Sequence, residues 1–145
     1  MLKFSKKTDY GLMAIGCLAE HEGKRLVTTK VIADQCHIPM ELLAKILQRL
    51  AKHGLIKSHN GSHGGYSLAK ELSRITVGEV IEAIEGPFAI AACYRGQGMS
   101  ACDQLSHCTI RRPLGQVQAD IAALLSRMTL DEIYAPAAKE EGVRA

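Results

Sequence analysis

Three cysteines share one short, glycine-bearing stretch of this 145-residue chain, and their thiols are the first candidates for chemistry. Eight residues separate Cys93 from Cys102 and five separate Cys102 from Cys108, with Gly96 and Gly98 in the first interval. Thiolates are soft ligands that select iron–sulfur clusters, zinc or cuprous copper, and glycine gives the backbone freedom to fold around an inorganic core. Three thiolates leave at least one coordination position for a ligand from elsewhere. The stretch therefore predicts a labile, sensing metal site.

Other uses of these cysteines fit less well or stay open. Structural zinc sites usually pair four ligands two to four residues apart, and the spacing here is wider. The sequence has no four-cysteine cluster spacing, phosphate-binding loop or paired acid and base, so we expect neither an enzyme nor a small-molecule substrate. A cluster-free sensor that uses one of the three as a reactive thiolate remains an alternative. Cys17 lies among small and apolar residues of a predicted helix, and we expect it in the core. Cys36, at the end of the next helix, is expected in the core or partly exposed and unused.

The composition indicates a folded domain with a polyanion as partner. The chain is 47% hydrophobic, no apolar run is long enough to span a bilayer, and no secretory signal pattern opens the sequence. With five cysteines, an odd number, we expect a reducing, cytoplasmic location without membrane contact. Residues 1–75 carry 12 Lys+Arg against 6 Asp+Glu, and residues 76–145 carry 6 against 9. The basic first half favours nucleic acid, although excess lysine also serves solubility alone.

A helix-turn-helix is predicted in this basic half, after a first helix over residues 5–22. Its first helix begins at an N-cap, Thr28 or Thr29, and runs to about residue 36. Its second helix has Pro39 in the first turn and runs to about residue 53. One face of that helix is apolar, and the opposite face is polar, formed by Glu41, Lys45, Gln48, Arg49 and Lys52. An ordinary amphipathic helix with a solvated face is the alternative.

A β-hairpin follows directly, which turns the motif into a winged helix-turn-helix. Residues 55–58 and 66–68 read as strands, with the turn signal Asn60-Gly61 between them. We expect Lys45 and Arg49 to face the major groove of double-stranded DNA and Gln48 to reach a base edge. We expect Lys30 and Lys52 to contact phosphate. The remaining candidates for DNA contact are Thr28, Thr29, Glu41, His59, Asn60, Ser62 and His63.

The second half is predicted to be helical around the cysteine loop. A helix capped by Thr76 covers residues 77–85. Beyond the loop, apolar residues recur at alternating intervals of four and three, which is the seam of a paired helix: Ile110, Leu114, Val117, Ile121, Leu124 and Met128. The partner of this seam is the first helix or, as we favour, a second copy of the chain. We expect a mainly α fold with a DNA-binding domain over residues 1–86, a cysteine loop over 87–109, a dimerisation helix and short terminal helix over 110–134, and a disordered tail over 135–145.

Five short motifs accompany the three-cysteine loop: Thr8-Asp-Tyr-Gly-Leu12, Gly54-Leu-Ile-Lys-Ser58, Gly64-Gly-Tyr-Ser-Leu68, Thr76-Val-Gly-Glu-Val-Ile81 and Thr129-Leu130. Through them, residues 1–134 resemble the Rrf-two family of winged-helix regulators, whose iron–sulfur members include IscR-like and NsrR-like proteins. The resemblance implies a homodimeric transcription regulator that pairs through its long helix, over residues 110–128, and whose [2Fe-2S] or [4Fe-4S] cluster tunes its affinity for an operator. We expect it to act as a repressor.

Two departures from the family pattern concern the site. Family wings often carry an arginine where this chain has Asn60, which shifts the expected wing contact to the neighbouring His59, Ser62 and His63. IscR-like members place a histidine ligand three residues after the third cysteine, where this chain has Arg111, which cannot ligate. The candidates for the fourth ligand are Asp9, which matches the acidic ligand that NsrR-like relatives take from the partner subunit, His107, and an exogenous thiol or water.

Overall fold

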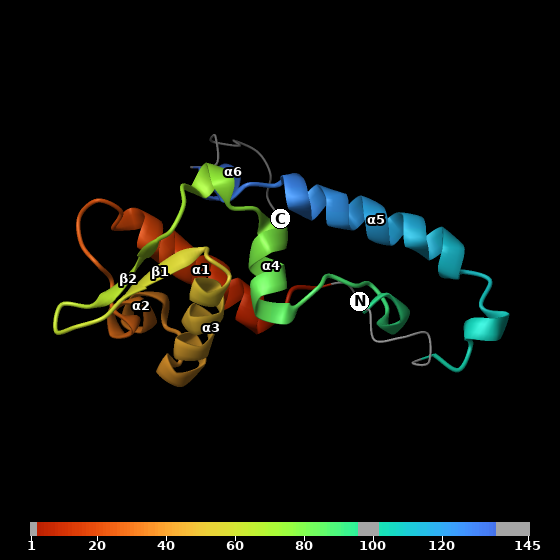
Figure 1. Cartoon of the computed structure of the whole chain (residues 1–145), viewed down its shortest axis with the longest axis horizontal. Helices are drawn as coiled ribbons and strands as arrows, with labels where there is room; N and C mark the ends of the chain where they lie inside the picture. Colours follow the sequence, from red (N-terminus) through yellow and green to blue (C-terminus); the bar gives the residue numbers. More distant parts are fainter. Residues whose placement is uncertain (1–2, 96–101, 136–145) are drawn as a thin grey trace, which may run out of the picture.

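Residues 3–95 and 102–135 are described by the structure, a computed structural model of the chain. The fold is mainly helical with one small antiparallel hairpin, as the sequence predicts (Figure 1). The predicted tail beyond residue 135 and the middle of the cysteine loop, residues 96–101, lie outside the described residues. In the described part, no helix has the length and apolar character needed to cross a membrane.

Three helices build the first layer: α1 (Lys6–Glu20), α2 (Thr29–Cys36) and α3 (Met40–Lys52). The hydroxyl of Thr28 accepts from the amide of Val31 at 3.3 Å and so caps α2. The turn between α2 and α3 contains His37 with φ 54°, a left-handed conformation that is uncommon for a residue with a side chain. Pro39 is the N-cap of α3, one residue before the first turn in which it is expected from the sequence.

The wing consists of β1 (Ile56–His59) and β2 (Gly65–Leu68), which pair from Ile56 opposite Leu68 to His59 opposite Gly65. Val27 adds an isolated bridge to the hairpin, because its amide donates to the Tyr66 carbonyl and its carbonyl accepts from the Tyr66 amide. Gly65 is required there: its φ is 154°, and a Cβ would approach the Val27 carbonyl oxygen to 2.9 Å. The wing is therefore fixed to the start of α2 by its backbone.

The helix α4 (Val77–Glu85) follows a short 3-10 turn, η1 (Leu72–Arg74), and carries a full capping box. The Thr76 hydroxyl accepts from the Glu79 amide, and the Glu79 carboxylate accepts from the Thr76 amide at 2.8 Å and from Lys70 Nζ at 2.9 Å. Burial raises the pKa of Glu79, but the bonds from Lys70 and Thr76 outweigh it, so the net pKa is lowered.

The long helix α5 (Arg111–Arg127) runs back along α4 toward α6 (Leu130–Tyr134) and extends to one side of the winged part (Figure 1). The segment that carries the cysteines leaves the end of α4 and reaches the far end of α5. Its described residues include the 3-10 turns η2 (Ala92–Tyr94) and η4 (Leu105–His107). The Tyr134 hydroxyl donates to the Leu12 carbonyl and so ties α6 back to α1.

Candidate functional site

The outer face of α3 is a narrow polar stripe. Its members are exposed and recur at intervals of four, three and four residues: Glu41, Lys45, Gln48 and Lys52. At 100° per residue these positions fall within an arc of about 60°. The opposite face is buried, through Leu43, Ile46, Leu47 and Leu50. The helix therefore presents one carboxylate, one amide and two ammonium groups along a line, which suits the edge pattern of a DNA groove.

Arg49 lies at the edge of this stripe and makes a contact within the chain. Its guanidinium Nη1 donates to the Ile84 carbonyl oxygen at 2.5 Å, at the end of α4. Arg49 is exposed, and on the helix it lies about 40° from Lys45 toward the buried face. The bond turns its guanidinium toward α4 within the chain. That Arg49 faces the major groove stays a prediction.

The tip of the wing and the start of α2 enclose a shallow pocket of about 310 Å³. Thr28, Thr29, His59 and Asn60 are among its lining residues. The sequence places His59 in a solvated or phosphate-facing role, and its Nε2 lies 2.9 Å from the Ser67 hydroxyl across the hairpin. Asn60, Ser62 and His63 are exposed at the tip, and Lys30 is exposed on α2. The start of a helix beside polar turn residues favours the binding of a phosphate oxygen, because its backbone amides are free to donate.

The cysteine loop brings its described cysteines to half-buried positions. Cys93 lies within η2, Cys102 opens the second described segment, and Cys108 is the C-cap of η4. Between the described residues, no set of three or more Cys, His, Asp or Glu side chains is gathered closely enough to hold a metal ion. The thiols thus have the chemistry of soft-metal ligands, without a preassembled site among the residues described.

Two side chains anchor the first part of this loop to α5. Gln118 uses both ends of its amide: Oε1 accepts from the Ile90 amide and Nε2 donates to the Phe88 carbonyl, each at 2.8 Å. The Tyr94 hydroxyl donates to the Arg111 carbonyl at the start of α5. These bonds position Cys93. The role of Gln118 was not predicted, because the sequence shows only an amide residue next to the apolar seam of α5.

The apolar seam of α5 is divided between the core and the surface. Ile121 and Met128 pack against the core, whereas Ile110, Val117 and Leu124 are 59%, 44% and 47% exposed. Leu124 also lines a groove of about 720 Å³ between the start of α1, the end of α4 and α5. A stripe with a seven-residue repeat remains uncovered on the single chain.

Residues 4–136 match the Rrf2 family, described as iron-dependent transcriptional regulators. The chain belongs to this family. It is 30% identical to the transcriptional regulator NsrR of Bacillus licheniformis over 91% of this chain and 92% of that one. Among solved structures, IscR of T. potens has 28% identity and a TM-score of 0.71 and covers 99% of this chain and 94% of its own. CymR, the global cysteine regulator of B. subtilis, has 27% identity and a TM-score of 0.71 over 93% and 98%.

The family identifies the protein as a transcriptional regulator that binds DNA, and the winged fold is that of its relatives. The relatives are regulators and not enzymes, in agreement with the prediction from the sequence. For the fourth ligand, the structure leaves Asp9 exposed in the first turn of α1 and His107 exposed in η4, directly before Cys108.

Cys17 and Cys36 belong to the α1–α2 contact, away from the loop. Cys17 is 3% exposed, and its thiol donates to Gln35 Oε1 at 3.4 Å. Cys36 Sγ lies 3.9 Å from the Met13 carbonyl oxygen. Burial raises the pKa of Cys17 to about 11, and the neighbouring Cys36 adds to the shift. Burial also raises the pKa of the half-buried Cys36. The burial of Cys17 agrees with its predicted place in the core.

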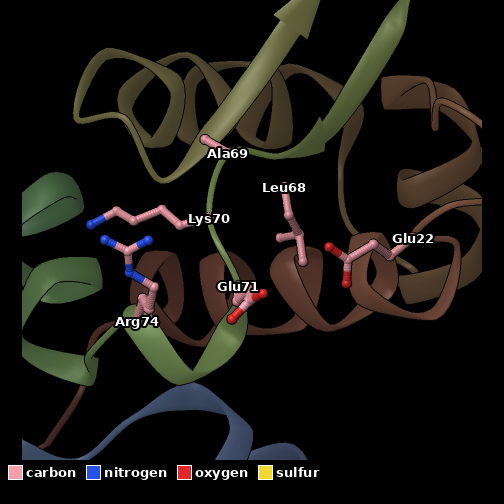
Figure 2. Close-up of a pocket in the computed structure, with 6 residues that line it drawn as sticks. All are labelled: Glu22, Leu68, Ala69, Lys70, Glu71 and Arg74. Carbon is pink, nitrogen blue, oxygen red and sulfur yellow. The ribbon is translucent and has the colours of Figure 1, made fainter.

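A second pocket, of about 490 Å³, lies where the wing meets η1 (Figure 2). Two acidic and two basic residues line it, namely Glu22, Glu71, Lys70 and Arg74, with Leu68 and Ala69 between them. Lys70 is already paired with Glu79. The lining therefore has no excess of charge that would select an anion or a cation.

Proposed function

We propose that this regulator is a homodimeric repressor that senses iron–sulfur status, redox change or nitrosative stress through a cluster held by Cys93, Cys102 and Cys108. The observation that carries the proposal is the position of these three half-buried thiols on one segment. That segment starts at the end of α4, which packs on α3, and it is anchored on α5 through Gln118. The proposed sensor thus connects DNA-reading and pairing elements, in the cytoplasm.

For DNA reading, we place α3 in the major groove. The stripe of Lys45, Gln48 and Lys52 supports this assignment because its side chains are exposed and aligned. Gln48 is the candidate for a base edge, because an amide can pair bidentately with adenine. The pocket between the start of α2 and the wing supports a backbone contact by Thr28, Thr29 and Asn60.

For pairing, we place a second copy of the chain against α5. The exposed stripe of Ile110, Val117 and Leu124 supports this, because a seven-residue repeat matches another helix. In the dimer, Asp9 of the partner subunit is our first candidate for the fourth ligand, as in NsrR-like relatives. A carboxylate is a hard ligand that holds iron less firmly than a thiolate does. One iron would then stay exchangeable, which suits a sensor.

The colour of the protein tests the cluster. Protein purified without oxygen, or reconstituted with iron and sulfide, is expected to be brown or red with visible absorption. Cys93→Ser, Cys102→Ser or Cys108→Ser should bleach it. Cys17→Ser and Cys36→Ser are the matched controls, because both thiols lie in the α1–α2 contact. Bleaching by a control while Cys102→Ser keeps its colour contradicts the assignment.

A cluster-free thiol sensor is the second candidate. The similarity to CymR, named a global cysteine regulator, supports it, as do the three free thiols of the loop. Colourless anaerobic protein without zinc, whose DNA affinity changes when a loop thiol is oxidised, would favour this function. Colourless protein that contains stoichiometric zinc would instead indicate a structural metal.

A further inference from the structure

The end of α4 is the point at which the cysteine loop, the first helix and the recognition helix meet. Gly86, with φ 86°, leaves the helix and opens the loop. Just before it, the Glu85 carboxylate accepts from the hydroxyls of Ser5 and Thr8 at the start of α1. The preceding residue, Ile84, makes two contacts that reach α3.

The side chain of Ile84 fills the crossing of α1 and α3. It is 1% exposed, and a Cβ placed on Gly11 of α1 would collide with its Cδ1. The same Cβ would lie 3.6 Å from Ile46 of α3. Ile84 belongs to the same buried core as Ile15 of α1 and Ile46 of α3. Because a packed interior transmits strain, we expect a shift of this helix end to displace α1 or α3.

The carbonyl of Ile84 is held by Arg49. The last carbonyls of a helix have no partner inside the helix, and arginine is well suited to them because it also neutralises the negative end of the helix dipole. Nη1 donates at 2.5 Å, across 35 residues of sequence. Ile84 is therefore held in two ways: its side chain packs in the core, and its carbonyl accepts a bond from Arg49 of α3. Ile84 lies two positions before Gly86, where the loop begins.

We propose that Arg49 is a positioning residue: its bond to the Ile84 carbonyl holds α3 to the end of α4, so that the state of the cysteine loop sets the placement of the recognition helix. This inference rests on the proposed function, because it presupposes that the loop is the sensor and that α3 reads DNA. The rival assignment is that Arg49 contacts DNA directly, as its place on a basic helix suggests.

Salt dependence separates the two assignments. Arg49→Met removes the charge and keeps an unbranched stem. Its affinity is compared with wild type across salt concentrations, on a duplex selected from a random library by the wild-type protein. If Arg49 bound a phosphate, this substitution would reduce the slope of log K against log salt by about 0.9 for each subunit, or about 1.8 for the proposed dimer. We expect an unchanged slope, and a reduction of that size overturns the proposal. Lys52→Met, on the exposed stripe, is the matched control expected to show the reduction.

Hydrogen exchange tests the bond without DNA or cluster. The Gly86 amide donates to the Glu82 carbonyl at 3.0 Å in the last turn of α4. We expect its exchange to quicken about tenfold in apo Arg49→Met, because this helix end loses its tie to α3. Arg49→Lys, which retains a charge and a donor, should restore part of the protection. Unchanged exchange in Arg49→Met overturns the proposal, and Lys52→Met should leave exchange as in wild type.

A third measurement tests whether Arg49 transmits the state of the loop to DNA binding. It is the ratio of DNA affinities of anaerobically loaded and apo protein, and a purely structural role of Arg49 would leave this ratio unchanged. We expect this ratio to fall toward one in Arg49→Met and to recover in part in Arg49→Lys. An unchanged ratio in Arg49→Met overturns the proposal. A ratio of one already in wild type overturns the proposed cluster function and transmission with it, whereas the exchange measurement still decides whether Arg49 holds the helix end.

Discussion

At the residue scale, Gln48 is the side chain expected to carry sequence specificity. It is exposed between Lys45 and Lys52 on the outer stripe of α3. Gln48→Ala should cost about 1–3 kcal/mol on a selected DNA site and much less on random DNA, because removing a base-reading group penalises only the matching sequence. Competition binding with both duplexes measures the difference. Equal losses on the two duplexes would move Gln48 to the phosphate-contacting class.

The fourth ligand is decided by two further substitutions. Asp9→Ala should alter the visible spectrum and shorten the lifetime of the cluster under air, because one iron would be left without a protein ligand. His107→Ala should leave both unchanged, since His107 directly precedes Cys108 and the two side chains reach one small cluster with difficulty. Absorption spectra followed in air make the comparison. An effect of His107→Ala alone would contradict the proposal that Asp9 of the partner subunit is the fourth ligand. Asp9 would then only stabilise the start of α1 through the helix dipole.

The five thiols should differ in their rates of alkylation. At pH 8 a thiol with a pKa of about 11 is ionised to about one part in a thousand, and Cys17 is almost fully buried as well. Iodoacetamide should therefore modify the three loop cysteines of the apo protein first and Cys17 last, as read by peptide mass spectrometry. The order should disappear in denaturant. Early modification of Cys17 in folded protein would contradict its place in the core.

Residue roles are predictable where local context decides them. The apolar neighbours of Cys17 predict a place in the core, and its burial confirms this. The prediction that Arg49 contacts DNA treats five polar residues of one helix as one face. At 100° per residue Arg49 lies only about 40° from Lys45, so helix geometry alone leaves it at the edge of that face. Its acceptor, the Ile84 carbonyl, lies 35 residues away. No sequence pattern specifies a contact at that distance.

At the element scale, the capping box of α4 is a measurable source of stability. Thr76→Ala should lower the free energy of unfolding by about 0.5–2 kcal/mol, because the Glu79 amide loses its acceptor. Thermal unfolding at pH 7 measures it, and Ser73→Ala, an exposed hydroxyl in η1, is the control. The pKa of Glu79 is lowered on folding, so its contribution is present above its unfolded pKa and is lost as pH falls through the folded value. A Thr76→Ala effect no larger than the control would contradict the cap.

Most elements are predictable because the residues that begin and end each element are its neighbours in the sequence. Thr28 and Thr76 are caps, Gly86 ends α4, and the apolar spacing marks α3 and α5. The contacts between elements are not predictable in the same way. The bridge from Val27 to Tyr66 and the Gln118 amide pair both join groups that are far apart in the sequence.

At the scale of the whole molecule, the exposed stripe of α5 predicts the oligomeric state. Val117→Glu should convert a dimer to monomers, because it puts an uncompensated charge in the centre of an apolar helix contact. Ala119→Glu, exposed about 160° away on the same helix, should leave the dimer intact. Sedimentation velocity of both variants and of wild type checks the expectation. A wild-type monomer, or a dimer that survives Val117→Glu, would contradict pairing through this stripe.

The Gln118 amide pair has a consequence for how long the proposed regulator retains its state. Because Gln118 fastens the loop to α5 through Phe88 and Ile90, the sensing segment travels with the helix that we expect to join two chains. Loaded and empty chains then mix only as fast as dimers trade subunits. The distribution of loaded and empty dimers then reflects earlier conditions, and the lifetime of the dimer sets how long it does so.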